Sequence, residues 1–176
     1  MTKLQPIRAI FGNFDWKKRL LFVAGILLSY YAALFLIPVP GYGAGDLSFE
    51  GNLVGWIDRN FMPGRLLQKT YDELALLTQL PAMCLTILGA WAGELIQNKQ
   101  TRVAQKIKTL IGLGVLGIGL GLLWSLHFPI NKHLWTSSFI LLVAGMAFLF
   151  FALFYWLIDI KGFTKWAFFF KVIGMN

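Results

Sequence analysis

The sequence predicts an all-α integral membrane protein: a polytopic bundle of four complete membrane-spanning helices and a truncated fifth. Composition is the first observation behind this prediction, since 57% of the 176 residues are hydrophobic and only 14% are charged. Soluble domains carry about 25% charged residues. The composition excludes a disordered chain and argues against a soluble globular domain. The single cysteine, Cys84, excludes an internal disulfide and is interpreted as a packing residue.

Long apolar stretches are the second observation, because a helix needs about 20 apolar residues to cross a bilayer. Four stretches meet this length, and the only acid within them is Glu94, near the end of the second. The last apolar stretch stops about halfway through a span. We therefore expect residues 1–176 to form one membrane domain that is a fragment of a larger protein. The predicted spans are 20–38, 78–97, 109–126, 137–158 and the incomplete 166–176.

Basic residues predict the orientation of these spans. Eleven of the sixteen lysines and arginines lie before span one, between spans two and three, and between spans four and five, whereas the other two loops hold four. The positive-inside rule then places the N-terminus in the cytoplasm, and a long loop, 39–77, and a short loop, 127–136, on the outer face. The net charge of +8 accordingly indicates inner loops that face anionic lipid rather than a nucleic-acid partner.

Polar and aromatic residues of the two outer loops are candidates for a substrate pocket. The long loop is rich in glycine, which allows tight bends and close approach to a ligand; a plain surface or re-entrant loop is the alternative. In the short loop each histidine taken singly is interpreted as an interfacial polar residue, and this loop carries no defensible metal-ligand set or catalytic triad. The predicted substrate-binding residues are Asn52, Asp58, Asn131, Lys132, Trp135 and Ser137.

A basic cluster between spans two and three has two interpretations. Lys99, Arg102 and Lys106 are candidates for binding the phosphates of a large anionic cofactor. The alternative is ordinary topology-setting charge.

Glycines in span three match the dinucleotide-binding pattern G-x-G-x-x-G from Gly112 to Gly117. The pattern lies in an uncharged hydrophobic span instead of a strand-to-helix turn, so close helix packing is the better interpretation. Because Gly89 and Gly93 of span two have the same four-residue spacing as Gly117 and Gly121, we expect spans two and three to pack on each other.

Four segments resemble the membrane-bound acyltransferases related to heparan-α-glucosaminide N-acetyltransferase, whose bacterial members are called NagX-like or DUF5009 proteins. The stretch NKHLWTSSF, residues 131–139, is the most specific. The segments come in family order: PVPGYGAGDLSFEGNLVGWIDRNFMPG, LTQLPAMCLTILGAWAGE, FPINKHLWTSSF and ALFYWLIDIKGFTKWAFFFKVIGMN.

The resemblance implies an enzyme of the bacterial inner membrane that moves an acetyl group from cytoplasmic acetyl-CoA to an amino sugar on the outer face. It also raises the expectation that the inner basic residues contact the CoA phosphates. The family's catalytic histidine lies in a setting like H-A-x-W-x-G, which this sequence lacks, so His127 and His133 do not inherit its role and we assign no catalytic residue. The alternatives are a sugar transporter that performs no acyl transfer and an inactive fragment; a homo-oligomer is also open.

Overall fold

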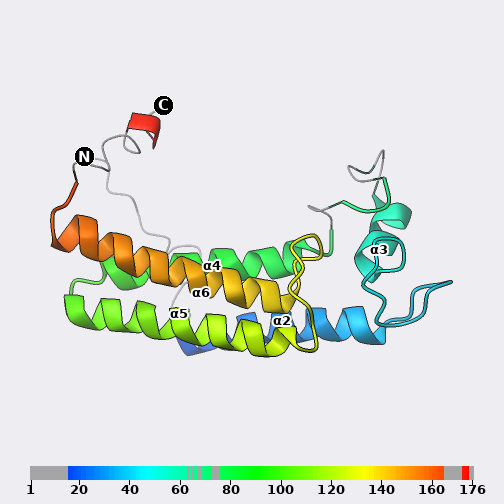
Figure 1. Ribbon diagram of the computed structural model, residues 1–176, viewed down its shortest axis with the longest axis horizontal. Helices are drawn as coiled ribbons and strands as arrows, with labels where there is room; N and C mark the ends of the chain where they lie inside the picture. The colour runs from blue at the N-terminus through cyan, green and yellow to red at the C-terminus, as the bar shows by residue number, and fades with distance from the viewer. Residues whose placement is uncertain are drawn as a thin grey trace.

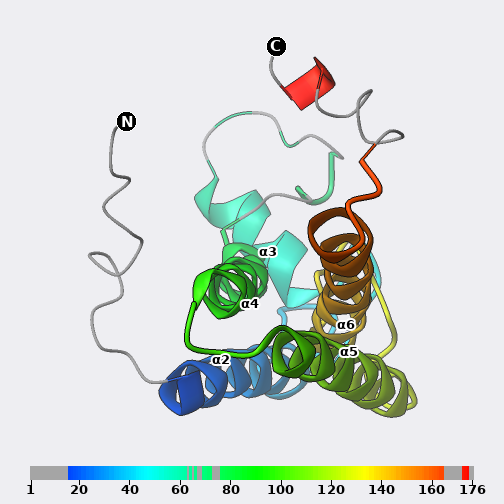
Figure 2. The same cartoon turned by 90° about the vertical axis from the view of Figure 1, so that its left-hand side faces the viewer.

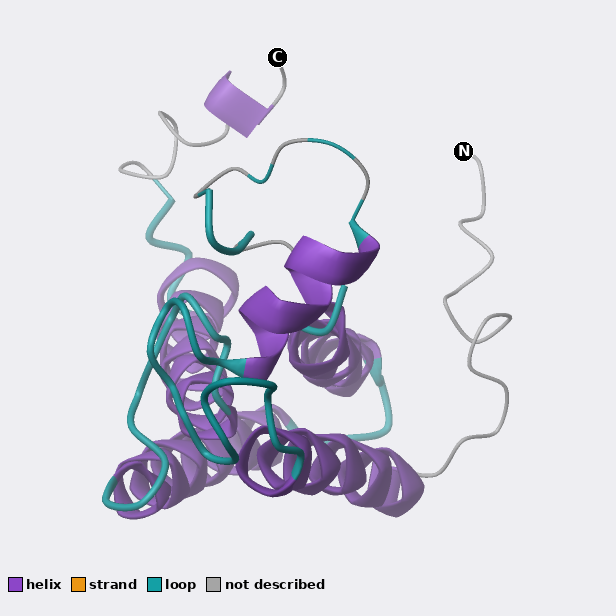
Figure 3. Cartoon of the chain, turned by 90° about the vertical axis from the view of Figure 1, so that its right-hand side faces the viewer, coloured by secondary structure: helices purple, strands orange, loops and turns teal. Residues whose placement is uncertain are grey.

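The computed structural model describes residues 16–164, except 63, 65, 67, 68 and 73–75, and residues 172–174. Four long helices run alongside one another (Figure 1): α2 (Trp16–Leu36), α4 (Gln79–Gln97), α5 (Val103–Ser125) and α6 (Ser137–Phe154). Seen along the bundle, α2 and α5 form one layer and α4 and α6 the other (Figure 2). The described residues form helices and loops but no strand (Figure 3).

The four predicted spans are confirmed as helices long and apolar enough to cross a membrane. The third begins at Val103, six residues before its predicted start, because the polar turn around Lys106 also becomes helical. The fourth continues from α6 into a π-helix, η1 (Tyr155–Ile160). The predicted incomplete span at 166–176 lies outside the described residues, apart from one helical turn at 172–174.

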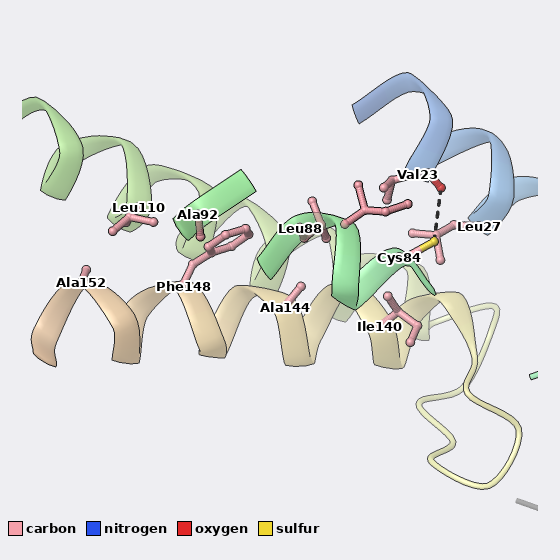
Figure 4. Packing of buried hydrophobic residues seen from close by; sticks show 11 residues of the cluster. Val23, Leu27, Cys84, Leu88, Ala92, Leu110, Ile140, Ala144, Phe148 and Ala152 are labelled. Atoms are coloured by element: carbon pink, nitrogen blue, oxygen red, sulfur yellow. Dashed lines mark hydrogen bonds between the residues drawn. The ribbon is translucent and has the colours of Figure 1, made fainter. Parts of the chain in front are cut away.

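The bundle has a central apolar core to which all four long helices contribute (Figure 4). Leu27, Cys84 and Ile140 are almost fully buried in it. The Cys84 Sγ atom lies 4.0 Å from the Val23 carbonyl oxygen, which is consistent with its predicted packing role. A second cluster, at the loop-bearing end, comprises Tyr30, Leu34, Val54, Phe128 and Leu134.

Glycines allow α5 and α6 to approach each other closely. A Cβ atom added to Gly145 would lie 2.6 Å from the Ile118 backbone nitrogen, and one added to Gly121 would lie 2.8 Å from that of Leu142. The expected packing of spans two and three through their glycines is therefore wrong. Span three uses its glycines against span four instead, and a Cβ at Gly89 or Gly93 would have no neighbour within 4 Å in the described structure. The spacing identified helices with small-residue faces but not their partners.

Charged side chains lie near the end of the bundle that carries the short α4–α5 connection, which we call the turn end. There the buried Arg19 donates to Glu94, with 2.8 Å between Nη1 and Oε2. Lys106 is also buried, and its Nζ donates to the Ile96 carbonyl in the last turn of α4, 2.5 Å away. A cation is favourable at this position because the carbonyls of a helix C-terminus carry partial negative charge. These contacts tie α2 and α5 to the end of α4.

Candidate functional site

The long and short loops lie together at the opposite end of the bundle, which we call the loop end (Figures 1 and 3). The short loop is organised around Asn131. Its Oδ1 accepts backbone N–H groups from His133 at 2.9 Å and Leu134 at 3.3 Å, and its own backbone N–H donates to the Thr136 hydroxyl at 3.0 Å. Trp135 takes a left-handed backbone conformation, with φ of 48°. The loop is thus a compact turn built by its own side chains.

Buried hydroxyl groups fasten this turn to the helix bundle. Ser137 donates to the Leu27 carbonyl of α2 at 2.7 Å, and Ser138 donates to the Phe128 carbonyl at 2.6 Å. The Tyr30 hydroxyl donates to the Leu134 carbonyl at 2.6 Å. Because buried hydroxyls without a partner are costly, these bonds fix where the short loop sits.

The long loop contains a helix that the sequence analysis did not predict, α3 (Leu53–Phe61). Asn52 begins it as an N-cap, since its Oδ1 accepts the Gly55 N–H at 2.7 Å. An asparagine before an apolar run is a recognised start signal, so this helix was predictable. Arg59 then holds the loop to α3 by donating to the Thr70 carbonyl and to the Glu50 carbonyl, each at 2.7 Å.

Aromatic rings and one histidine connect the two loops. The rings of Phe49 and Tyr71 stack with centroids 4.9 Å apart, and His133 contacts Phe49 edge-on at 5.6 Å. The Tyr71 hydroxyl lies 3.1 Å from His133 Nδ1. The two loops predicted to lie on one face are therefore in contact, although through residues that the sequence analysis did not select for a site.

Asp58 is the most unusual of the predicted site residues. Its side chain is fully buried on α3, and its Oδ2 accepts the Asp72 backbone N–H at 3.1 Å. Its Oδ1 has no hydrogen-bond partner within the described residues. Burial raises the pKa of the Asp58 carboxyl, and the Asp72 N–H only partly opposes this effect. A buried carboxyl with a raised pKa and an unused oxygen is suited to hold or transfer a proton.

A cavity of about 340 Å³ lies beside this carboxyl. Arg59 and Lys69 line it together with Asp58, so both signs of charge meet there. Such a cavity is suited to a polar ligand that both donates and accepts hydrogen bonds. Within the part of the chain that the structure describes, no group of three or more histidine, cysteine or acidic residues is placed to hold a metal ion.

The structure divides the predicted substrate residues between two places. Asn52 and Asp58 lie on or next to α3, and Asn52 uses its side chain to cap that helix. The Asn131 side chain accepts hydrogen bonds from the backbone of the short loop, and the Ser137 hydroxyl donates to a carbonyl of α2. Lys132 is exposed. Trp135 is half-buried, and its ring meets Phe139 edge-on with centroids 6.2 Å apart.

The predicted cofactor-binding residues lie at the turn end. Lys99 and Arg102 are exposed, and Lys106 is bonded to α4 as described above. Sequence analysis missed Phe49, Tyr71 and the contact role of His133, because residues 62 positions apart carry no local signal of their pairing.

Two known proteins are similar to this chain. They are the heparan-alpha-glucosaminide N-acetyltransferases of Homo sapiens and Mus musculus. The human protein is 25% identical over 173 residues, covering 81% of this chain, and the mouse protein is 26% identical over 178 residues, covering 84%. The chain spans only about a quarter of the length of these relatives, 26% and 27%. No protein-family model matches the chain.

The similarity supports the resemblance drawn from the sequence at the level of the enzyme class. Four helices are long and apolar enough to span a bilayer, which indicates an integral membrane protein. Most of the chain is similar to N-acetyltransferases, which suggests a relationship to membrane acyltransferases.

Proposed function

We propose that this chain forms part of a membrane acyltransferase that moves an acetyl group from acetyl-CoA on one face of the membrane to an amino sugar on the other. The observation that carries the proposal is the match to two N-acetyltransferases over more than four fifths of the chain. The name of these relatives specifies a glucosaminide acceptor and acetyl transfer. The chain covers about a quarter of their length, so acetyl transfer is proposed for an enzyme of which this chain forms one part.

In this proposal the amino sugar binds at the loop end. An amine must lose a proton to attack an acetyl group, and a positioned carboxylate can accept that proton. Asp58 supports this role through its unpartnered Oδ1 and the adjoining cavity lined by Arg59 and Lys69. Asn52 and Asn131 act here by shaping α3 and the short loop, because their side chains are already hydrogen-bonded. Lys132 and Trp135 remain proposed pocket residues, whereas Ser137, whose hydroxyl donates to the Leu27 carbonyl, positions the short loop.

The CoA moiety binds at the turn end in the same proposal. Lys99 and Arg102 are exposed and supply positive charge for phosphates, as guanidinium and ammonium groups commonly do. Lys106 supports the proposal less, since its Nζ is bonded to the Ile96 carbonyl. The positive-inside rule supports a cytoplasmic turn end, and the NagX-like resemblance supports a bacterial inner membrane.

Acetyl transfer in proteoliposomes tests the proposal. The full-length product of the gene is reconstituted, given radiolabelled acetyl-CoA outside and glucosamine inside, and assayed for N-acetylglucosamine. Asp58→Asn is expected to lower kcat by about 10²–10⁴-fold, the usual contribution of a general base. Asp159→Asn is the matched control, because Asp159 is exposed on η1 away from the loop end. Release of unmodified glucosamine from the vesicles without acetylation would instead support a transporter.

A further inference from the structure

An apolar cavity of about 580 Å³ lies between the spanning helices. The residues that line it include Leu20 and Leu28 of α2, Leu88 of α4, Leu116 of α5 and Phe148 of α6. Figure 4 shows Leu88 and Phe148 on the inner side of the bundle, and Figure 2 shows α2 and α5 together in one layer. Every described residue that lines this cavity has an apolar or aromatic side chain or is a glycine.

The size and the apolar lining of this cavity suit a hydrocarbon chain. A water-sized group needs about 10–15 Å³ of cavity volume, and a methylene group is of similar size, so a cavity of about 580 Å³ accommodates a long run of methylenes. The lining offers no side-chain hydrogen bond beyond the indole N–H of Trp124.

Positive charge lies at the turn-end rim of the same cavity. Lys17 precedes Leu20 by three residues and Ala24 by seven, so it shares the face of α2 that lines the cavity. Lys17 is exposed, and its Nζ lies 5.6 Å from the centroid of the Trp16 ring. The neighbouring Lys18 is exposed as well. A phosphate group at this rim would therefore contact an exposed ammonium group at the edge of the apolar cavity.

We propose that this cavity binds one acyl chain of an anionic phospholipid, whose phosphate contacts Lys17 at the rim. Basic residues next to spanning helices recognise anionic lipid head groups by charge, and the apolar cavity between α2 and α5 adds a fixed place for one tail. This lipid site is separate from the proposed acetyl-acceptor cavity, which lies beside Asp58 at the loop end.

Native mass spectrometry of the protein tests the cavity. The protein is purified in mild detergent with equal amounts of phosphatidylglycerol and phosphatidylcholine that carry the same acyl chains. The wild type is expected to retain one phosphatidylglycerol. Ala24→Phe places a ring in the cavity and is expected to abolish retention, whereas Ala147→Phe, at an exposed position of α6 outside the lining, leaves it unchanged. Equal retention by these two variants would overturn the proposal.

The head-group contact is tested with an exposed lysine, whose replacement does not threaten folding. Lys17→Gln is expected to lower the preference for phosphatidylglycerol by about fivefold, the factor expected for one lysine near an anionic surface. Lys161→Gln is the matched control, because Lys161 is also exposed at a helix end, with its Nζ 5.3 Å from the Trp156 ring centroid. A wild type that retains both lipids equally, or no lipid because another helix fills the cavity, would refute the site. Helicity by circular dichroism confirms that each variant is folded.

Discussion

The Tyr71 hydroxyl lies 3.1 Å from Nδ1 of His133, across 62 residues of sequence. Together with the stacked ring of Phe49, this contact holds the long loop against the short loop. The contact therefore joins the loop that carries Asp58 to the short loop.

Removing the Tyr71 hydroxyl is expected to loosen the junction of the two loops. Tyr71→Phe keeps the aromatic stack but loses one hydrogen bond, so the free energy of unfolding should fall by about 0.5–1.5 kcal/mol. Tyr42→Phe is the control, because Tyr42 is 54% exposed. Chemical denaturation in detergent, followed by tryptophan fluorescence, measures both. Equal values for the two variants would mean that the Tyr71–His133 contact does not stabilise the fold.

Two acids of the long loop are expected to respond to pH in opposite directions. Burial raises the pKa of Asp58 in the folded protein, so the folded state holds more protons and stability falls as pH rises from about 3.8 through the raised value. Asp58→Asn should remove that loss and be at least as stable as the wild type at pH 7. Hydrogen bonds from Ser48 lower the pKa of the exposed Asp46, so its contribution is present at neutral pH and is lost as pH falls through the lowered value.

Unfolding measured between pH 3 and pH 8 checks this pair of acids. Asp46→Asn is expected to lose a little stability at neutral pH and none at the acid end. The Asp58→Asn variant also separates function from stability, because it should impair acetyl transfer while preserving stability. A variant that is both inactive and strongly unstable at pH 7 would contradict the account of Asp58 as a functional acid.

Glycine substitutions test the close approach of α5 and α6. Gly145→Ala adds a Cβ 2.6 Å from the Ile118 nitrogen and 2.7 Å from the Gly114 carbonyl oxygen, backbone atoms that cannot move aside cheaply. We expect a loss of about 1–3 kcal/mol, typical of overpacking. Gly89→Ala, with no atom within 4 Å of its Cβ, should be neutral or stabilising by up to about 1 kcal/mol. Thermal unfolding in detergent measures the difference, and a Gly145→Ala variant as stable as Gly89→Ala would reject the close contact.

The ion pair at the turn end is expected to contribute measurable stability. Glu94→Gln removes the charge that faces Arg19, whose side chain is only 8% exposed, while that of Glu94 is 31% exposed. Hydrogen bonds to charged groups contribute about 1.5–3 kcal/mol, and partial exposure places the expected loss near 1–2 kcal/mol. Asp159→Asn, at an exposed acid, is expected to change stability by less than about 0.5 kcal/mol. Guanidinium or urea titration distinguishes the two.

Hydropathy was sufficient to predict the four spans, because the absence of charge over about 20 residues leaves few alternatives to a membrane helix. Periodic small residues also indicated a close helix contact, yet they did not reveal that Gly121 faces Leu142 of α6. The identity of a partner depends on which helices are neighbours, and that information lies in the whole chain.

The candidate site was predicted less completely. Asp58 was selected for its residue type and is found buried with an unused oxygen. Asn52 was selected for the same reason, but its side chain caps α3, a local role that its position before an apolar run already indicated. Tyr71 and His133 were not selected for a site, since their significance arises only from a contact between distant segments.

The close α5–α6 packing has a consequence for the order of assembly. These helices are adjacent in the sequence and are joined only by residues 126–136, so their contact forms early and at a modest entropic cost. The bond from Ser137 to the Leu27 carbonyl spans 110 residues and forms only after that hairpin can dock on α2. A substitution at Gly145 should therefore slow the folding of the bundle, whereas one at Ser137 should mainly speed its unfolding.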